Sequence, residues 1–328
     1  MKYRIFHNTI YEYSASAESC HNLVRLSPRL IERGATAGLP SSARGSAGAS
    51  PSHGALASHC GIRNPQSALA QTCLDMQLTI DPAPASLHSY DDYFGNRVHS
   101  FAIYQPHLTL TIIAESQVSI EPRPQLDLSA TIGWQETAEW LRSDSSPAAV
   151  EALEYVFDSP YIRTSDLLGG FAAAHFPSGR PLGEAALALT QAIHREFKYD
   201  PKATTIDTCV EDVLDKRRGV CQDFAHLAIA SLRSLGLACR YVSGYLRTDP
   251  QPGRPRLVGA DASHAWISVY SPEVGWIDLD PTNGCVVSDR HITLGWGRDF
   301  HDVSPVKGSV LGGGESTLRV AVDVEPIA

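Results

Sequence analysis

The spacing of apolar residues changes near residue 146, and this change limits the chain to folds that join a β-rich part to a mixed part. Before it, apolar and polar residues alternate, as in residues 2–13, where Tyr3 and Ile5 share one face. A period of two residues is typical of a half-exposed strand. After it, apolar residues recur at helical spacing, and strand patterns return from about residue 238. We therefore predict an α+β protein.

The same patterns, read with the positions of proline and glycine, give the expected elements. The predicted strands of the first half are residues 2–13, 73–80, 97–104 and 107–120. The predicted helices are residues 147–157, 183–197, 208–215 and 222–235. The predicted strands of the second half are residues 239–246, 263–270, 275–279 and 316–324.

Composition divides the chain into segments. Residues 34–66 are rich in Gly, Ala, Ser and Pro, which offer too little apolar surface to repay the entropy of ordering. We predict a flexible surface insertion there. Residues 126–146 are polar and are predicted to be a linker. The expected organisation is a β-rich N-terminal domain over residues 1–125 and a second domain over residues 147–328.

Charge and hydropathy argue against several classes of partner. The formal net charge of −9 provides no global basic surface for nucleic acid or anionic lipid. No run approaches the roughly 18 apolar residues that cross a bilayer. The N-terminus alternates polar and apolar residues instead of presenting the apolar core of a signal peptide. We therefore expect a cytoplasmic protein with no membrane or nucleic-acid partner.

The cysteines argue against a disulfide scaffold and a structural zinc site. There are seven, an odd number, scattered along the chain and never arranged as CxxC. Cys221, His226 and His264 also lack the spacing of a metal-binding motif, so neither a metal nor a cofactor is predicted. The question is then whether one of the free thiols is reactive.

Cys221 stands where a reactive thiol is favoured. It lies in the segment GVCQDFAHLAIASL, where a loop with a glycine enters a predicted long helix. Free amide groups and the positive end of the helix dipole favour the thiolate there, and the thiolate is the nucleophile. The same amides can hold an oxyanion. Taken alone, the pattern also fits a buried structural cysteine at the start of an apolar helix.

A histidine and an aspartate downstream complete a possible triad. The predicted strand SHAWISVY begins near His264, and the predicted strand GWIDLDP ends at Asp280. A short connection with proline, glutamate and glycine predicts a hairpin, which places both side chains at one end of a sheet. A carboxylate there would fix the imidazole tautomer while the other ring nitrogen faces the thiol.

The three segments GVCQDFAH, HAWISVY and WIDLDPTNG together resemble the core motifs of the transglutaminase-like superfamily. YRIFHNTIYEY and DYFGN resemble the β-rich N-terminal domain of its bacterial branch, and DRHITLGWGRDFHDVSPVKG resembles the segment that follows the catalytic aspartate. The similarity covers nearly the whole chain and is most specific between residues 197 and 306. The main departure is residues 34–66, where the family has a shorter link. The resemblance implies a papain-like transglutaminase core over residues 147–328, with a helix-start cysteine packed on an antiparallel sheet.

The resemblance implies a role for each member of the triad. Cys221 is the nucleophile, His264 is the general base and then acid, and Asp280 orients the imidazole. Asp278 is a rival carboxylate on the same strand, but Asp280 occupies the motif position before Pro281.

Supporting residues are implied less directly. Tyr199 is a candidate for supporting the oxyanion, with an ordinary core tyrosine as the alternative. Gln222 is a second supporting candidate, although it and Asp223 also suit a capping role at the first helical turn. Cys285 lies close after the aspartate and is interpreted as a bystander thiol.

The implied activity is acyl transfer through a thioester on Cys221, with a protein or peptide as substrate. Water as acceptor gives a protease or amidase, and an amine gives a transglutaminase; hydrolysis is favoured because no dedicated amine site is visible. The alternative is a non-catalytic binding module that keeps the fold. Neither the identity of the substrate nor the oligomeric state follows from the residues.

Overall fold

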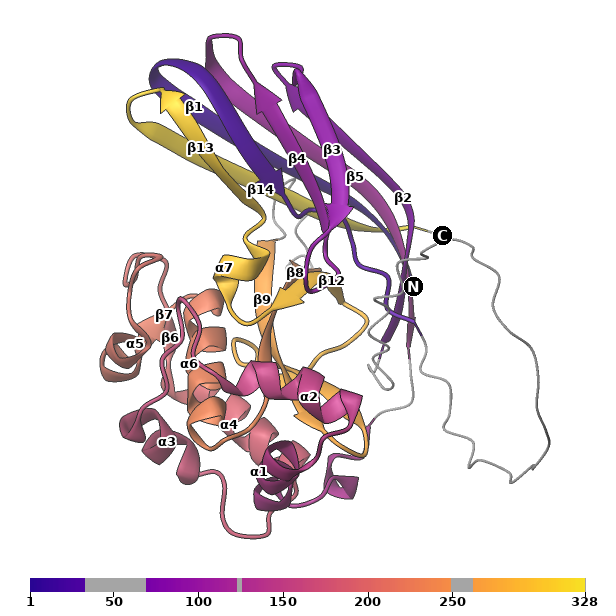
Figure 1. The fold of residues 1–328 in the computed structure, drawn as a ribbon, viewed down its shortest axis with the longest axis vertical. Helices are drawn as coiled ribbons and strands as arrows, with labels where there is room; N and C mark the ends of the chain where they lie inside the picture. Colours follow the sequence, from indigo (N-terminus) through magenta and orange to yellow (C-terminus); the bar gives the residue numbers. More distant parts are fainter. Residues whose placement is uncertain (33–68, 123–125, 249–261, 328) are drawn as a thin grey trace, which may run out of the picture.

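The computed structural model describes residues 1–32, 69–122, 126–248 and 262–327, so the predicted insertion over 34–66 lies outside the described residues. The mixed α+β class is confirmed, with long strands at one end of the molecule and helices gathered around a second sheet at the other (Figure 1). Among the described residues, no helix combines the length and apolar character that spanning a bilayer requires.

The first sheet is organised around one long strand. Its strands are β1 (Lys2–Val24), β2 (Leu69–Asp81), β3 (Ser86–Asp91), β4 (Arg97–Ile103), β5 (His107–Pro122), β13 (Val306–Gly312) and β14 (Ser316–Ile327). The first half of β1 pairs with β5 and β14, and its second half pairs with β4 and β13. Register shifts around Ala17 separate the two halves, so β1 takes part in both parts of the curved sheet.

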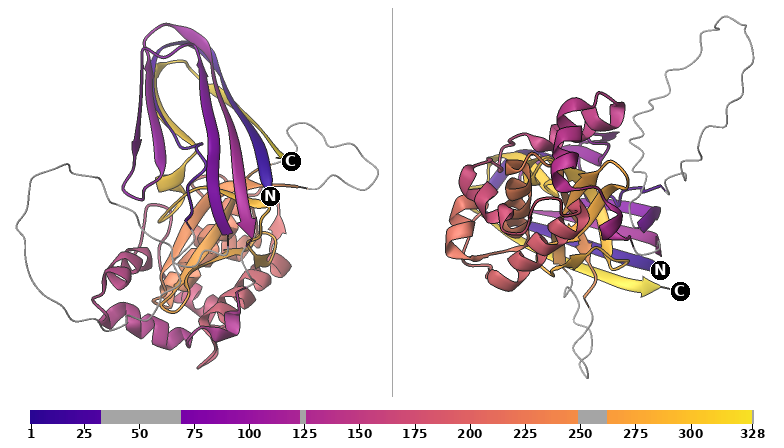
Figure 2. Two further views of the ribbon diagram at one scale, coloured as in Figure 1. Left: turned by 90° about the vertical axis from the view of Figure 1, so that its right-hand side faces the viewer. Right: turned by 90° about the horizontal axis from the view of Figure 1, so that it is seen from below.

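The end of the chain belongs to this first sheet. Lys2 lies opposite Ile327 in the antiparallel pairing of β1 with β14, and the two termini are side by side in both views (Figure 2). The last strands of the expected second domain over 147–328 therefore pair with the first sheet and not with the second. The strand predicted at 316–324 is confirmed, but a period of two residues does not reveal which sheet a strand joins.

The second sheet has the strand order β11-β10-β9-β8-β12. These strands are β8 (Cys239–Leu246), β9 (Ala262–Ser271), β10 (Gly275–Asp280), β11 (Cys285–Val286) and β12 (His291–Gly297). The hairpin predicted from the sequence is confirmed by the antiparallel pairing of β9 with β10. The strand β12, in contrast, has no counterpart among the predicted elements.

Helices cover this second sheet, and the core lies where their buried side chains pack against it. The helices are α1 (Trp134–Ser143), α2 (Pro147–Leu153), α3 (Asp166–Ala173), α4 (Leu182–Glu196), α5 (Val210–Lys216), α6 (Cys221–Ser234) and α7 (Phe300–Val303). The four predicted helices correspond to α2, α4, α5 and α6. The segment predicted as a linker contains α1, which buries Ala138 and Leu141. The apolar stripe of α1 is narrow within a polar sequence, which explains why composition suggested a linker.

The two parts of the molecule are joined by a shared core and by side-chain amides. Ile292 and Leu294 of β12 pack among the buried residues of the first sheet. The Gln71 amide donates to the Thr293 carbonyl over 2.7 Å and accepts from the Thr293 N–H over 2.8 Å. Asn96 makes the same paired contact with the backbone of Trp296. The outer edge of β12 is thus hydrogen-bonded although it lies in the interior.

Candidate active site

Cys221 is the first residue of α6, as the sequence predicts. The Asp223 carboxylate accepts the Val220 N–H over 2.7 Å and the Thr204 hydroxyl over 2.7 Å, which fixes the start of the helix. A Cβ added at Gly219 would lie 2.7 Å from the Asp223 carboxylate, so a glycine is needed two residues before the nucleophile. Asp223 thus has the capping role that was one alternative for it.

His264 and Asp280 lie on the adjacent strands β9 and β10 and form a buried pair. His264 Nε2 donates to Asp280 Oδ2 over 2.8 Å, and the side chain of Asp280 is fully buried. Asp280 Oδ1 accepts the N–H groups of Thr282 and Asn283 over 2.9 and 3.1 Å. Because Nε2 is used by the carboxylate, Nδ1 is the ring nitrogen left to face the thiol.

The electrostatics of the pair favour an imidazolium. Burial by itself lowers the pKa of His264, but hydrogen bonds to Asp280 and Cys221, with the charges of both, raise it to about 10. Burial alone would raise the pKa of Asp280, but hydrogen bonds from His264 and His291, with the charge of His264, move it well below its ordinary value. The Cys221 thiol is thus a hydrogen-bond partner of the His264 imidazole.

The other predicted residues lie around this pair. Tyr199 lies in β6 (Lys198–Tyr199) opposite Gly219 of β7 (Arg218–Gly219), so it flanks the loop that leads to Cys221. It is half exposed, and burial, followed by the charges of Cys221 and Asp223, raises its pKa. Its hydroxyl therefore stays a donor at neutral pH.

Gln222 is half-buried beside Cys221, and its side chain makes no hydrogen bond among the described residues. Asp278 is the carboxylate that the sequence left as a rival, and the imidazole hydrogen bond goes to Asp280 instead. Cys285 pairs with Asp280 across β10 and β11, and burial together with the Asp280 charge raises its pKa. Cys285 is therefore a poor nucleophile at neutral pH.

Sequence reasoning missed two further partners of the carboxylate. His291, at the start of β12, directs Nε2 at Asp280 Oδ2 over 3.1 Å. Asn283 donates from Nδ2 to the same oxygen over 2.6 Å. Asn283 follows the DP motif and could have been suspected from it. A lone histidine at the start of an unpredicted strand gives no comparable signal.

His264, Asp280 and His291 also bring three potential metal ligands within 4.8 Å of one another. The two nitrogens lie 2.8 and 3.1 Å from the shared oxygen. Two ligands of a tetrahedral zinc ion would be about 3.3 Å apart at ordinary bond lengths. The observed distances are those of N–H···O hydrogen bonds, so we interpret the cluster as a hydrogen-bonded network.

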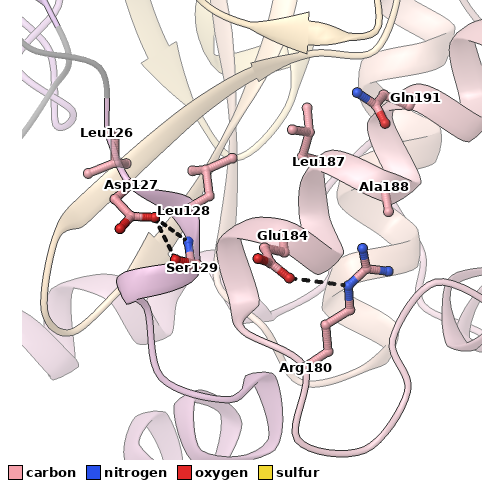
Figure 3. Close-up of a pocket in the computed structure, with 9 residues that line it drawn as sticks. All are labelled: Leu126, Asp127, Leu128, Ser129, Arg180, Glu184, Leu187, Ala188 and Gln191. Atoms are coloured by element: carbon pink, nitrogen blue, oxygen red, sulfur yellow. Dashed lines mark hydrogen bonds and ion pairs between the residues drawn. The ribbon is translucent and has the colours of Figure 1, made fainter.

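A separate pocket of about 630 Å³ lies between α4 and the 3-10 helix η1 (Leu128–Ala130) (Figure 3). Four of its polar residues are engaged with one another, because Asp127 accepts from Ser129 and Arg180 is paired with Glu184. None of the predicted site residues lines it. This pocket is distinct from the triad.

Comparisons with known proteins agree with the motifs. The sequence pattern of the "Transglutaminase-like superfamily" matches residues 173–281, and that of the "Bacterial transglutaminase-like N-terminal region" matches residues 55–119. An uncharacterized protein of Mycobacterium tuberculosis is 42% identical over 271 residues, which cover 81% of this chain and 86% of that protein.

Two further likenesses are more distant. A "Protein-glutamine gamma-glutamyltransferase" of Pseudomonas aeruginosa is 34% identical over 106 residues, which cover 31% of this chain and 16% of that protein. A solved structure of a "Putative Cysteine Protease" from Cytophaga hutchinsonii has a TM-score of 0.66 at 19% identity and covers 100% of this chain and 92% of that chain. The second likeness is one of fold. Motifs, fold and relatives together show that this chain belongs to the transglutaminase-like superfamily and carries its bacterial N-terminal region.

Proposed function

We propose that this chain is a thiol-dependent acyl-transfer enzyme that acts on peptide or carboxamide bonds, with a papain-like transglutaminase core. One observation carries the proposal. A cysteine at the N-terminus of α6 lies against an imidazole whose other nitrogen donates to the fully buried carboxylate of Asp280. This is the arrangement by which a thiolate, a general acid-base and an orienting carboxylate act together.

The first half of the reaction forms a thioester. The Cys221 thiolate attacks the carbonyl carbon, and the first N–H groups of α6, with Tyr199 nearby, stabilise the oxyanion. The His264 imidazolium gives its proton to the departing amine or ammonia as the C–N bond breaks. The products are the Cys221 thioester, a free amine and a neutral imidazole.

The second half releases the acyl group. Neutral His264 accepts a proton from water or from a primary amine as that group attacks the thioester, and the Cys221 thiolate leaves. Water yields a carboxylic acid, and an amine yields a new amide. The substrate we propose is a glutamine side chain of a protein or peptide, a class that fits the name of the Pseudomonas aeruginosa relative.

The test uses a glutamine-containing peptide with blocked ends, with and without a primary amine. Intact-mass spectrometry after an acid quench should show one acyl group on Cys221, and the released peptide shows whether water or the amine was the acceptor. Cys285→Ala is the matched control, because it removes a neighbouring thiol and should keep the adduct, whereas Cys221→Ala should abolish it. An adduct that persists in Cys221→Ala, or turnover without Cys221, contradicts the proposal.

A further inference from the structure

We propose that His291 is a positioning residue of the site, which holds the Asp280 carboxylate in the orientation that serves His264. This inference rests on the proposed function. His291 Nε2 lies 3.1 Å from Asp280 Oδ2, the same oxygen that accepts the His264 hydrogen bond over 2.8 Å. His291 is 4% exposed, so water does not compete for this contact.

The tautomer of His291 is fixed from its other side. The Ser288 backbone N–H donates to His291 Nδ1 over 3.2 Å, so Nδ1 acts as an acceptor and the ring proton resides on Nε2. His291 is therefore a neutral donor to Asp280. Of the two imidazoles on this carboxylate, only His264 has its second nitrogen free for the thiol, and the catalytic proton is directed there.

The other donors to Asp280 do not make His291 redundant. Asn283 also donates to Oδ2, but its side chain is on an exposed turn, where water can replace the contact. The two backbone N–H groups on Oδ1 fix one oxygen and leave the carboxylate free to turn about that end. Among the described residues, two buried side chains donate to Oδ2. One is His264, and the other is His291, which is left to hold the oxygen in place for it.

The fold brings His291 to this position through Gly244. Gly244 lies opposite His264 in the pairing of β8 with β9 and is close to the start of β12 on the other side. A Cβ at Gly244 would collide with the Ile292 carbonyl oxygen and with the Trp266 ring. Because Gly244 has no side chain, β12 can lie close to β8, and the centroids of the His264 and His291 rings are 6.1 Å apart.

Groups of either charge surround His291, so its effect must be measured directly. Asp280 and His264 face it from β10 and β9, and Asp278, whose pKa is raised by burial, is a further carboxylate near it on β10. Its ring also meets Trp266 edge-on, with centroids 5.3 Å apart. A packing role and a hydrogen-bonding role therefore have to be separated.

Two variants separate them. His291→Phe keeps the ring against Trp266 and loses the donor, whereas His291→Gln loses the ring and keeps an N–H donor near the same place. The readout is the rate at which iodoacetamide alkylates Cys221 in the intact protein as a function of pH. If the donor matters, His291→Phe slows alkylation about tenfold at neutral pH and shifts the profile to higher pH, while His291→Gln stays near wild type. Equal profiles for all three proteins, or a larger loss in His291→Gln, overturn the inference.

The wild-type protein gives a second measurement that needs no variant to fold. Nitrogen-15 NMR of histidine-labelled protein should show His291 as the neutral Nε2–H tautomer at a pH where His264 is cationic. A charged His291, or a proton on its Nδ1, overturns the inference. Failure of the proposed function looks different, because Cys221 would then react no faster in the wild type than the exposed Cys209.

Discussion

Replacing Asp280 with asparagine puts an amide in a site built entirely of donors. Asp280 Oδ2 faces N–H groups of His264, His291 and Asn283, and Oδ1 faces two backbone N–H groups. In the better orientation the asparagine oxygen takes the Oδ2 position, and its NH₂ faces the two backbone donors. In the other orientation, three donors lose their acceptor.

The cost follows from those contacts. The N–H groups of Thr282 and Asn283 are only partly buried, so losing their acceptor should destabilise the fold by about 2 kcal/mol, at about 1 kcal/mol each. The effect on chemistry is larger than the effect on stability. The imidazolium of His264 loses its buried counter-charge, and acyl transfer should fall by about 10³–10⁴-fold, as for asparagine in comparable triads.

The assay is the rate of thioester formation on Cys221, measured below the unfolding transition of each variant. Asp278→Asn is the matched control, because it is the same substitution two residues away on β10 and leaves the His264 hydrogen bond intact. We expect Asp278→Asn to react at nearly the wild-type rate. Near-normal rates in Asp280→Asn, or a comparable loss in Asp278→Asn, would refute the assignment of the orienting carboxylate.

Two further predictions concern the junction of the two sheets. Gln71→Ala leaves the N–H of Thr293 without an acceptor at a buried edge, while the Thr293 carbonyl keeps the Arg29 N–H, so the free energy of unfolding in urea should fall by about 1–3 kcal/mol. Gln77→Ala, on the exposed face of the same strand, should change it little, and equal effects would show that the amide does not cap β12. Burial lowers the pKa of His7 to about 4, and the His7 ring contacts the Tyr245 hydroxyl. Between pH 6.5 and 4 the His7 side chain is therefore protonated in the unfolded chain but not in the folded protein. Stability should fall by about 3 kcal/mol over that interval from this group, and the fall should become shallower in His7→Gln; an unchanged slope would contradict this origin.

The local elements and the triad could be predicted because they rest on short-range patterns. The start of α6 at Cys221 follows from the loop glycine and the apolar spacing, and the β9–β10 hairpin follows from its turn residues. His264 and Asp280 then lie close together because a hairpin places its two strands side by side. These inferences need contacts between residues that are near in sequence or share one motif.

The long-range contacts could not be predicted in the same way. The pairing of Lys2 with Ile327 joins the two ends of the chain, and nothing in an alternating pattern names its partner strand. The strand β12 contains two glycines in HITLGWG, which weaken a strand prediction. His291 was missed with it, since its contact with Asp280 depends on how closely β12 approaches Gly244.

The central claim is that Cys221 is the reactive nucleophile of this chain, activated by the His264 imidazole beside it. The most direct test is to alkylate the protein with iodoacetamide at about pH 6 and measure the rate at each cysteine by peptide mass spectrometry. Cys209, which is exposed, serves as the internal reference within the same molecule. Few ordinary thiols are ionised at this pH, so Cys221 should react about 10- to 100-fold faster than Cys209, and the difference should vanish in His264→Ala. Equal rates at Cys221 and Cys209 in the wild type, or an advantage of Cys221 that survives His264→Ala, would contradict it.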